Sequence, residues 1–113
     1  PKSFNDRIDA HLMYMIKSCS NLHTLVIRER ISTATILNLV LTADNLKYLY
    51  VRRNAVILRN DWPKHPANED YDWIKSSSQS YEKTEQQVSR IFGYKWKMLS
   101  DREFKLINPE LHV

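Results

Sequence analysis

Apolar and small residues in the first half of the chain recur at an interval of 24 residues. Seven positions of one unit match in character the positions 24 residues later: Leu12, Ile16, Cys19, Asn21, Leu22, Leu25 and Ile27 correspond to Ile36, Val40, Ala43, Asn45, Leu46, Leu49 and Val51. Each unit has apolar residues at helical spacing, then a small residue, then Asn-Leu-x-x-Leu-x-Ile or Val. A fixed period of this length is typical of solenoids, whose neighbouring units bury each other's apolar faces.

The last part of each unit alternates in polarity, which predicts a strand with one buried face. Leu25 and Ile27 take the buried positions of the first unit, and Leu49 and Val51 take those of the second. The positions predicted to point outward are Thr24, Val26, Arg28, Tyr48, Tyr50 and Arg52. The expected elements are parallel strands near 22–28 and 46–52 and helices near 8–18, 33–43 and 80–92. Ser32 is the expected N-cap of the second helix.

The period is lost after Asn54. We interpret 1–54 as two leucine-rich repeats and 55–79 as an irregular excursion rich in proline, acidic residues and serine. Trp62 and Trp73 are the expected anchors of this excursion.

Residues 80–113 are interpreted as a C-terminal helix, strand and capping segment, so that the chain forms one structural domain. Gly93 is the expected left-handed stop of the helix. Alternation of Tyr94, Trp96 and Met98 with lysines predicts a last strand. The spacing of Ser100 and Glu103 predicts a capping box and a short final helix.

Composition narrows the possible functions. A single glycine excludes glycine-rich phosphate loops, and a single cysteine excludes an internal disulfide, which favours a reducing compartment. No apolar run approaches the ~20 residues of a membrane span. The net charge of +4 is concentrated in residues 1–59, which carry nine Lys/Arg against four Asp/Glu. The sequence starts at Pro1 in the middle of the pattern, so we expect it to be part of a longer chain.

Candidate catalytic and metal-binding groups do not form a recognisable site. The four histidines are scattered, with no His-x3-His pair, and one cysteine does not make a zinc cage. Cys19 is expected to be a buried structural thiol. The carboxylates at 69, 70 and 72 read as a solvated acidic patch and not as a general acid–base pair. We therefore predict no catalysis, no metal and no cofactor.

The outward positions of the two predicted strands form the candidate binding surface. Stacking the two repeats places Val26 beside Tyr50 and Arg28 beside Arg52, which gives an aromatic and positive patch. The candidate partner-binding residues are Val26, Arg28, Tyr48, Tyr50, Arg52 and Trp96. A protein with an acidic patch is the favoured partner, because carboxylates would pair with the arginines. A single-stranded nucleic acid that stacks on the tyrosines is the less favoured alternative.

The segment from His11 to Leu25, which contains Cys-x-x-Leu-x-x-Leu, resembles the leucine-rich repeats of F-box proteins. Residues 85–96 are similar to the helix-glycine-tryptophan closure that follows the last repeat in some F-box receptors. The resemblance covers 8–53 well and 80–98 weakly, and it does not extend to the excursion at 62–78. Ala43 departs from the cysteine of the repeat consensus.

The resemblance implies an α/β leucine-rich-repeat solenoid fragment with short parallel strands, convex helices and an irregular C-terminal cap. It also implies a cytoplasmic or nuclear substrate receptor of a Skp1-cullin-F-box ubiquitin ligase. The F-box that binds Skp1 is absent from this chain, so the chain would be the substrate-binding end. A leucine-rich-repeat scaffold outside the ubiquitin system is the alternative.

Overall fold

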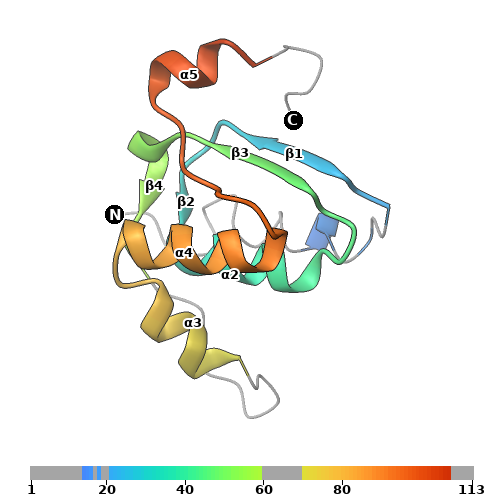
Figure 1. The fold of residues 1–113 in the computed structure, drawn as a ribbon, viewed down its shortest axis with the longest axis vertical. Coiled ribbons are helices and arrows are strands. Elements are labelled where there is room, and N and C mark those ends of the chain that lie inside the picture. The colour runs from blue at the N-terminus through green and yellow to red at the C-terminus, as the bar shows by residue number, and fades with distance from the viewer. Residues whose placement is uncertain (1–13, 17, 19–20, 60–69, 108–113) are drawn as a thin grey trace.

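The computed structural model describes residues 14–16, 18, 21–59 and 70–107, which form a mixed α/β structure with short parallel strands (Figure 1). The elements in chain order are β1 (Thr24–Ile27), β2 (Ile31–Ser32), α2 (Thr33–Thr42), β3 (Tyr48–Val51), a 3₁₀ turn (Arg53–Ala55), β4 (Val56–Ile57), α3 (Tyr71–Ser77), α4 (Tyr81–Phe92) and α5 (Asp101–Lys105). Figure 1 shows α2 and α4 together on one side of the β1–β3 pair, with α5 on the other.

The strands pair in parallel at the offset that the sequence predicts. Leu25 of β1 lies opposite Leu49 of β3, and Ile27 lies opposite Val51, so each residue faces the one 24 positions later. A second parallel pair joins β2 to β4, with Ile31 opposite Val56. Parallel strands need a crossover connection, and α2 is the crossover from β1 and β2 to β3.

The α2 helix forms the layer beneath the strands. The side chain of Ser32 accepts a hydrogen bond from the N–H of Thr35 and so caps the first turn, as predicted. The interior of α2 is almost entirely buried, and it packs against both α3 and α4. The helix runs from Thr33 to Thr42 and Ala43 is its C-cap, which confirms the predicted range of 33–43 to within one residue. Of the helix predicted at 8–18, residues 14–16 and 18 are helical, and the others, with Cys19, lie outside the described residues.

The α4 helix confirms the helix predicted near 80–92 and its predicted stop at Gly93. Ser80 caps its first turn by accepting from the N–H of Lys83, and Gly93 ends it in the left-handed conformation, with φ of 80°. A side chain at this backbone conformation is strained, which explains why the glycine stands here. The apolar face of α4 packs on α2.

The segment after α4 forms less regular structure than predicted. Trp96 and Met98 are buried while Lys95 and Lys97 are exposed, so the alternation holds from 95 to 98, but Tyr94, which it also predicts to be buried, is exposed. The segment is not a strand, however, because its pairing with β3 reduces to one parallel bridge between Arg52 and Leu99. The short helix α5 then starts at the predicted capping box, in which Ser100 and Glu103 each bond to the other's N–H.

The excursion contains more regular structure than its composition indicates. Val56 and Ile57 form β4, and residues 71–77 form α3, whose Ile74 is 2% exposed. Trp73 packs against the core as predicted. Trp62 lies outside the described residues.

One apolar core lies between the strands and the helices. Its central members are fully buried and come from β1, β2, α2, β3, α3 and α4: Leu25, Ile31, Ile36, Leu37, Leu39, Leu49, Ile74 and Val88. Leu25 and Ile27 and the residues that match them at the 24-residue offset, Leu49 and Val51, are all members of this core.

Candidate protein-interaction surface

The face of the β1–β3 pair that points away from the core carries the predicted surface. Tyr48 is 50% exposed, Tyr50 is half-buried, and Arg28 at the end of β1 is exposed. Tyr48 lies opposite Thr24, so the tyrosines lie beside β1 as the repeat predicts.

Val26 does not belong to the exposed surface. It lies opposite Tyr50 on the outward face, but its side chain is completely buried. It is also not a member of the main core cluster. Alternation correctly predicts the direction of Val26, but the predicted contact with a partner requires an exposure that the structure does not have.

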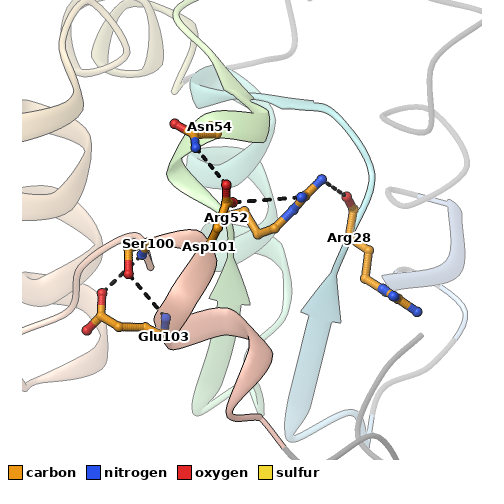
Figure 2. A network of polar contacts seen from close by, with 6 residues as sticks. All are labelled: Arg28, Arg52, Asn54, Ser100, Asp101 and Glu103. Atoms are coloured by element: carbon orange, nitrogen blue, oxygen red, sulfur yellow. Dashed lines mark hydrogen bonds and ion pairs between the residues drawn. The ribbon is translucent and has the colours of Figure 1, made fainter.

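Arg52 is held by contacts within the chain (Figure 2). Its guanidinium donates to the carbonyl oxygen of Arg28 at 3.1 Å and lies 3.8 Å from the carboxylate of Asp101. Asn54 donates to the other oxygen of Asp101 at 2.9 Å, and the guanidinium also lies over the ring of Phe104. Arg52 therefore ties α5 to the strands, and a charge used in this way is less available to a partner.

Trp96 is an internal residue. Its side chain is 5% exposed, and its indole N–H donates to the carbonyl oxygen of Leu49 at 2.8 Å. That oxygen points away from β1, where a further strand would otherwise bond to it. The side chain is buried beside the edge of β3, so it does not offer the exposed surface that the predicted contact with a partner requires.

Tyr94 extends the surface and was not among the predicted binding residues. It is 42% exposed, its hydroxyl donates to the carbonyl oxygen of Lys47 at 2.8 Å, and its ring stacks on Phe92 at 5.6 Å between centroids. Burial raises the pKa of the Tyr94 hydroxyl above its usual value, and the neighbouring Tyr50 and Tyr48 raise it further. Three tyrosines thus meet at one place, and with Arg28 they form what we call the tyrosine face: Arg28, Tyr48, Tyr50 and Tyr94.

The sequence gives no signal for Tyr94 as a surface residue, because its alternation with Trp96 and Met98 predicts a buried side chain. The repeat does not extend to this residue, so the pattern gave no reason to place it beside Tyr48 and Tyr50.

A pocket of about 490 Å³ adjoins the tyrosine face. Tyr48 and Tyr94 form one wall, and apolar side chains from the ends of α2 and α4, including Leu41, Ile91 and Phe92, form the others. Asp44 and Lys47 also line it. The pocket lies at the N-terminal end of β3, so Tyr48 belongs to both the pocket and the face.

Other chemistry receives no support in the part of the chain that the structure describes. No three His, Cys, Asp or Glu side chains come together as a metal site among these residues. Of the four histidines only His23 is described, and it is exposed. Asp70 and Asp72 flank the start of α3 and are exposed. In the same residues, no helix has the length and apolar character that a membrane crossing requires.

Comparisons with protein-family models, curated proteins and solved structures found no match to this chain.

Proposed function

We propose that this chain is a protein-recognition module built on leucine-rich-repeat units, and that it binds its partner through the tyrosine face. The observation that carries the proposal is the parallel pairing of β1 with β3 at an offset of 24 residues. This pairing brings Tyr48 and Tyr50 beside β1, close to Arg28 and Tyr94, although the residues are distant in sequence.

Three features support a repeat architecture. The pairs β1–β3 and β2–β4 are both parallel, and both join residues 24 or 25 positions apart. The helix α4 packs beside α2, in the place that the helix of the next unit would take. The bridge from Arg52 to Leu99 brings the segment after α4 to the edge of β3 where a third strand of such a series would lie. The excursion between β4 and α4 is an insertion within this series.

The composition of the tyrosine face favours a protein partner. Tyrosine offers a large contact area at a small loss of side-chain entropy, and arginine binds carboxylates through paired hydrogen bonds. Within the described residues, no hydrogen bond or ion pair of the Arg28 guanidinium is present, and Figure 2 shows its side chain directed away from the Arg52 network. This exposed positive charge suits an acidic segment of a partner.

The resemblance to F-box receptors gives the proposal a biological context. In that context the chain would hold substrates for a Skp1-cullin-F-box ubiquitin ligase, and it would perform no chemistry itself. Co-purification of Skp1 with the protein from its native cells supports this role. Its absence there, with other partners retained, favours a leucine-rich-repeat scaffold outside the ubiquitin system.

Affinity purification with quantitative mass spectrometry tests the recognition surface. The purified chain is immobilised, and the proteins it captures are compared with those captured by Arg28→Glu and Tyr50→Ala variants. Lys83→Glu, which makes the same charge change at an exposed position on α4, is the matched control. At least one protein should be retained by the wild type and the control and fall about tenfold or more in both variants. If every captured protein is retained equally, the tyrosine face is not the recognition surface.

Nucleic acid is the second partner class that the face could hold, because exposed tyrosines can also stack on bases. A titration with mixed single-stranded oligonucleotides at low salt separates the two. Binding that falls steeply as salt is added favours nucleic acid, because it reports the release of counterions from phosphates. The absence of binding removes this alternative.

A further inference from the structure

Several exposed apolar and aromatic side chains of the described residues lie around the pocket at the start of β3. Among the described residues, six large apolar or aromatic side chains are exposed. Three of them, Tyr48, Ile91 and Tyr94, line this one pocket. Clustered exposed apolar side chains around a concavity are typical of sites that receive an apolar group from a partner.

The pocket has the size and lining of an anchor site. Its volume of about 490 Å³ is within the range of pockets that hold small organic groups. Leu41, Ile91 and Phe92 make three of its sides apolar, and Tyr48 and Tyr94 add aromatic rings. Burial of an aromatic or large aliphatic side chain in such a site removes apolar surface from water on both partners.

The exposed Arg28 lies at the other end of the same strand pair. Arg28 follows Ile27, which lies opposite Val51, whereas the pocket begins at Tyr48. The rise of about 3.3 Å per residue places these two ends about 13 Å apart, which an extended segment spans in about four residues. The half-buried Tyr50 lies between them.

We propose that the partner presents an extended segment with a large apolar residue followed or preceded, about four residues away, by Asp or Glu. The apolar side chain enters the pocket beside Tyr48, Ile91 and Tyr94, and the carboxylate pairs with Arg28. This proposal rests on the proposed function and specifies its partner. The tyrosine face supplies the contact between the two anchors, so the pocket and the arginine act on one continuous segment.

Selection from a phage-displayed library of random nonapeptides tests this specification. Enriched peptides should share an apolar residue and an acidic residue at a separation near four. Synthetic fluorescein-labelled versions are then titrated by fluorescence polarisation against the chain and its variants. Ile91→Glu, which places a charge at the mouth of the pocket, should weaken binding about thirtyfold. Ile91→Ala should weaken it by a smaller factor.

Leu58→Glu is the matched control, because Leu58 is also exposed but does not line the pocket. It should leave the affinity within about twofold. Circular dichroism of each variant confirms that the fold is retained. Replacement of the acidic residue in the peptide by lysine should weaken binding to the wild-type chain and much less to Arg28→Glu.

Three results would overturn the anchor proposal. One is enrichment of peptides that lack the apolar residue, and another is equal binding to the Ile91 and Leu58 variants. The third is failure to enrich any peptide together with self-association that Ile91→Glu abolishes, which would assign the pocket to a second copy of the chain. If selected peptides ignore Ile91→Glu but lose affinity for Tyr50→Ala, the pocket assignment fails while recognition by the tyrosine face stands.

Discussion

Replacement of Trp96 by phenylalanine provides the sharpest test of the assignment of this residue to the interior. The change removes the indole N–H that donates to the carbonyl oxygen of Leu49 at 2.8 Å. Leu49 is 2% exposed and Trp96 is 5% exposed, so water does not readily replace the lost donor. The phenyl ring also fills less of the space that the indole occupies.

Both losses can be estimated from general scales. A buried acceptor left without a partner costs about 1–3 kcal/mol. The missing ring atoms cost about 1 kcal/mol more in lost apolar burial and incomplete packing. The expected decrease in the free energy of unfolding is therefore about 2–4 kcal/mol. A domain of this length has an unfolding entropy that converts each kcal/mol to about 4 °C, so Tm should fall by roughly 8–16 °C.

Urea denaturation followed by circular dichroism at 222 nm measures the first quantity, and thermal denaturation measures the second. Trp73→Phe is the control, because Trp73 is half-buried and, within the described residues, its indole N–H makes no hydrogen bond. Trp73→Phe should lower the free energy of unfolding by only about 1 kcal/mol. If the two variants lose equal stability, or if Trp96→Phe loses less than about 1 kcal/mol, Trp96 is not the internal plug described above.

Three further predictions concern the end of α4 and the start of α5. Gly93→Ala should lower the free energy of unfolding by about 1 kcal/mol in urea denaturation, because a φ of 80° strains a residue with a Cβ, while no atom within 4 Å of that Cβ adds a clash. Gly93→Asn should lower the free energy of unfolding by less, because asparagine tolerates the left-handed conformation better than alanine. The hydrogen bonds from Ser100 lower the pKa of Glu103, so the capping box should be complete above the usual pKa of glutamate and be lost as pH falls through the lowered value. NMR titration of the Glu103 carboxyl should show this, and a titration at the usual pKa would contradict it. Because the pKa of Tyr94 is raised, its ionisation should appear in an absorbance titration at 295 nm as a component at higher pH than ordinary tyrosines, and Tyr94→Phe should remove that component. The stabilisation linked to this shift should be present below the usual tyrosine pKa and be lost as pH rises through the raised pKa of Tyr94.

The parts of the fold that the sequence predicted are those that local or repeated rules determine. The cap at Ser32, the stop at Gly93 and the capping box at Ser100 each depend on a few adjacent residues. The register of β1 with β3 depends on the repeat, because a shift by one residue would turn Leu25 or Leu49 out of the core. The identities of adjacent residues and the 24-residue period can both be read from a single sequence.

The excursion was harder to predict because its stabilising contacts come from distant residues. Serines 77 and 78 look like a break, yet they are buried at the end of α3. The hydroxyl of Thr84 donates to the carbonyl oxygen of Ser77 at 3.0 Å, and that of Thr33 donates to the carbonyl oxygen of Ser78 at 2.8 Å. Threonines of α4 and α2 thus donate hydrogen bonds to carbonyl groups at the C-terminal end of α3, and no pattern of adjacent residues predicts such contacts.

Only part of the candidate site can be predicted from the sequence, because contacts from distant residues also decide which of its side chains are exposed. Alternation gives the direction of a side chain on a strand but not what covers it. Tyr48 and Arg28 point outward and are exposed, whereas Val26 points outward and is buried. Arg52 was expected to be free, but Asp101 of the following helix occupies it. The occupancy of Arg52 depends on α5, which lies outside the repeat.

The contacts around residues 94–99 indicate how the parallel strands are closed on one side. On the β3 side, the N–H of Leu99 bonds to the carbonyl oxygen of Val51. On the opposite side, the N–H of Trp96 donates to the Ser89 hydroxyl at 2.9 Å, and the N–H of Met98 donates to the Glu85 carboxylate at 2.8 Å. A further strand on this side would have to displace both α4 side chains, and Glu85 would then lose its partner. The edge is therefore protected by side chains of the preceding helix, which is a way of preventing unwanted strand pairing. The segment keeps the alternation of a strand without forming one because the carbonyl oxygen of Leu49 bonds to the Trp96 indole, which leaves only the bridge at Leu99 to pair with β3.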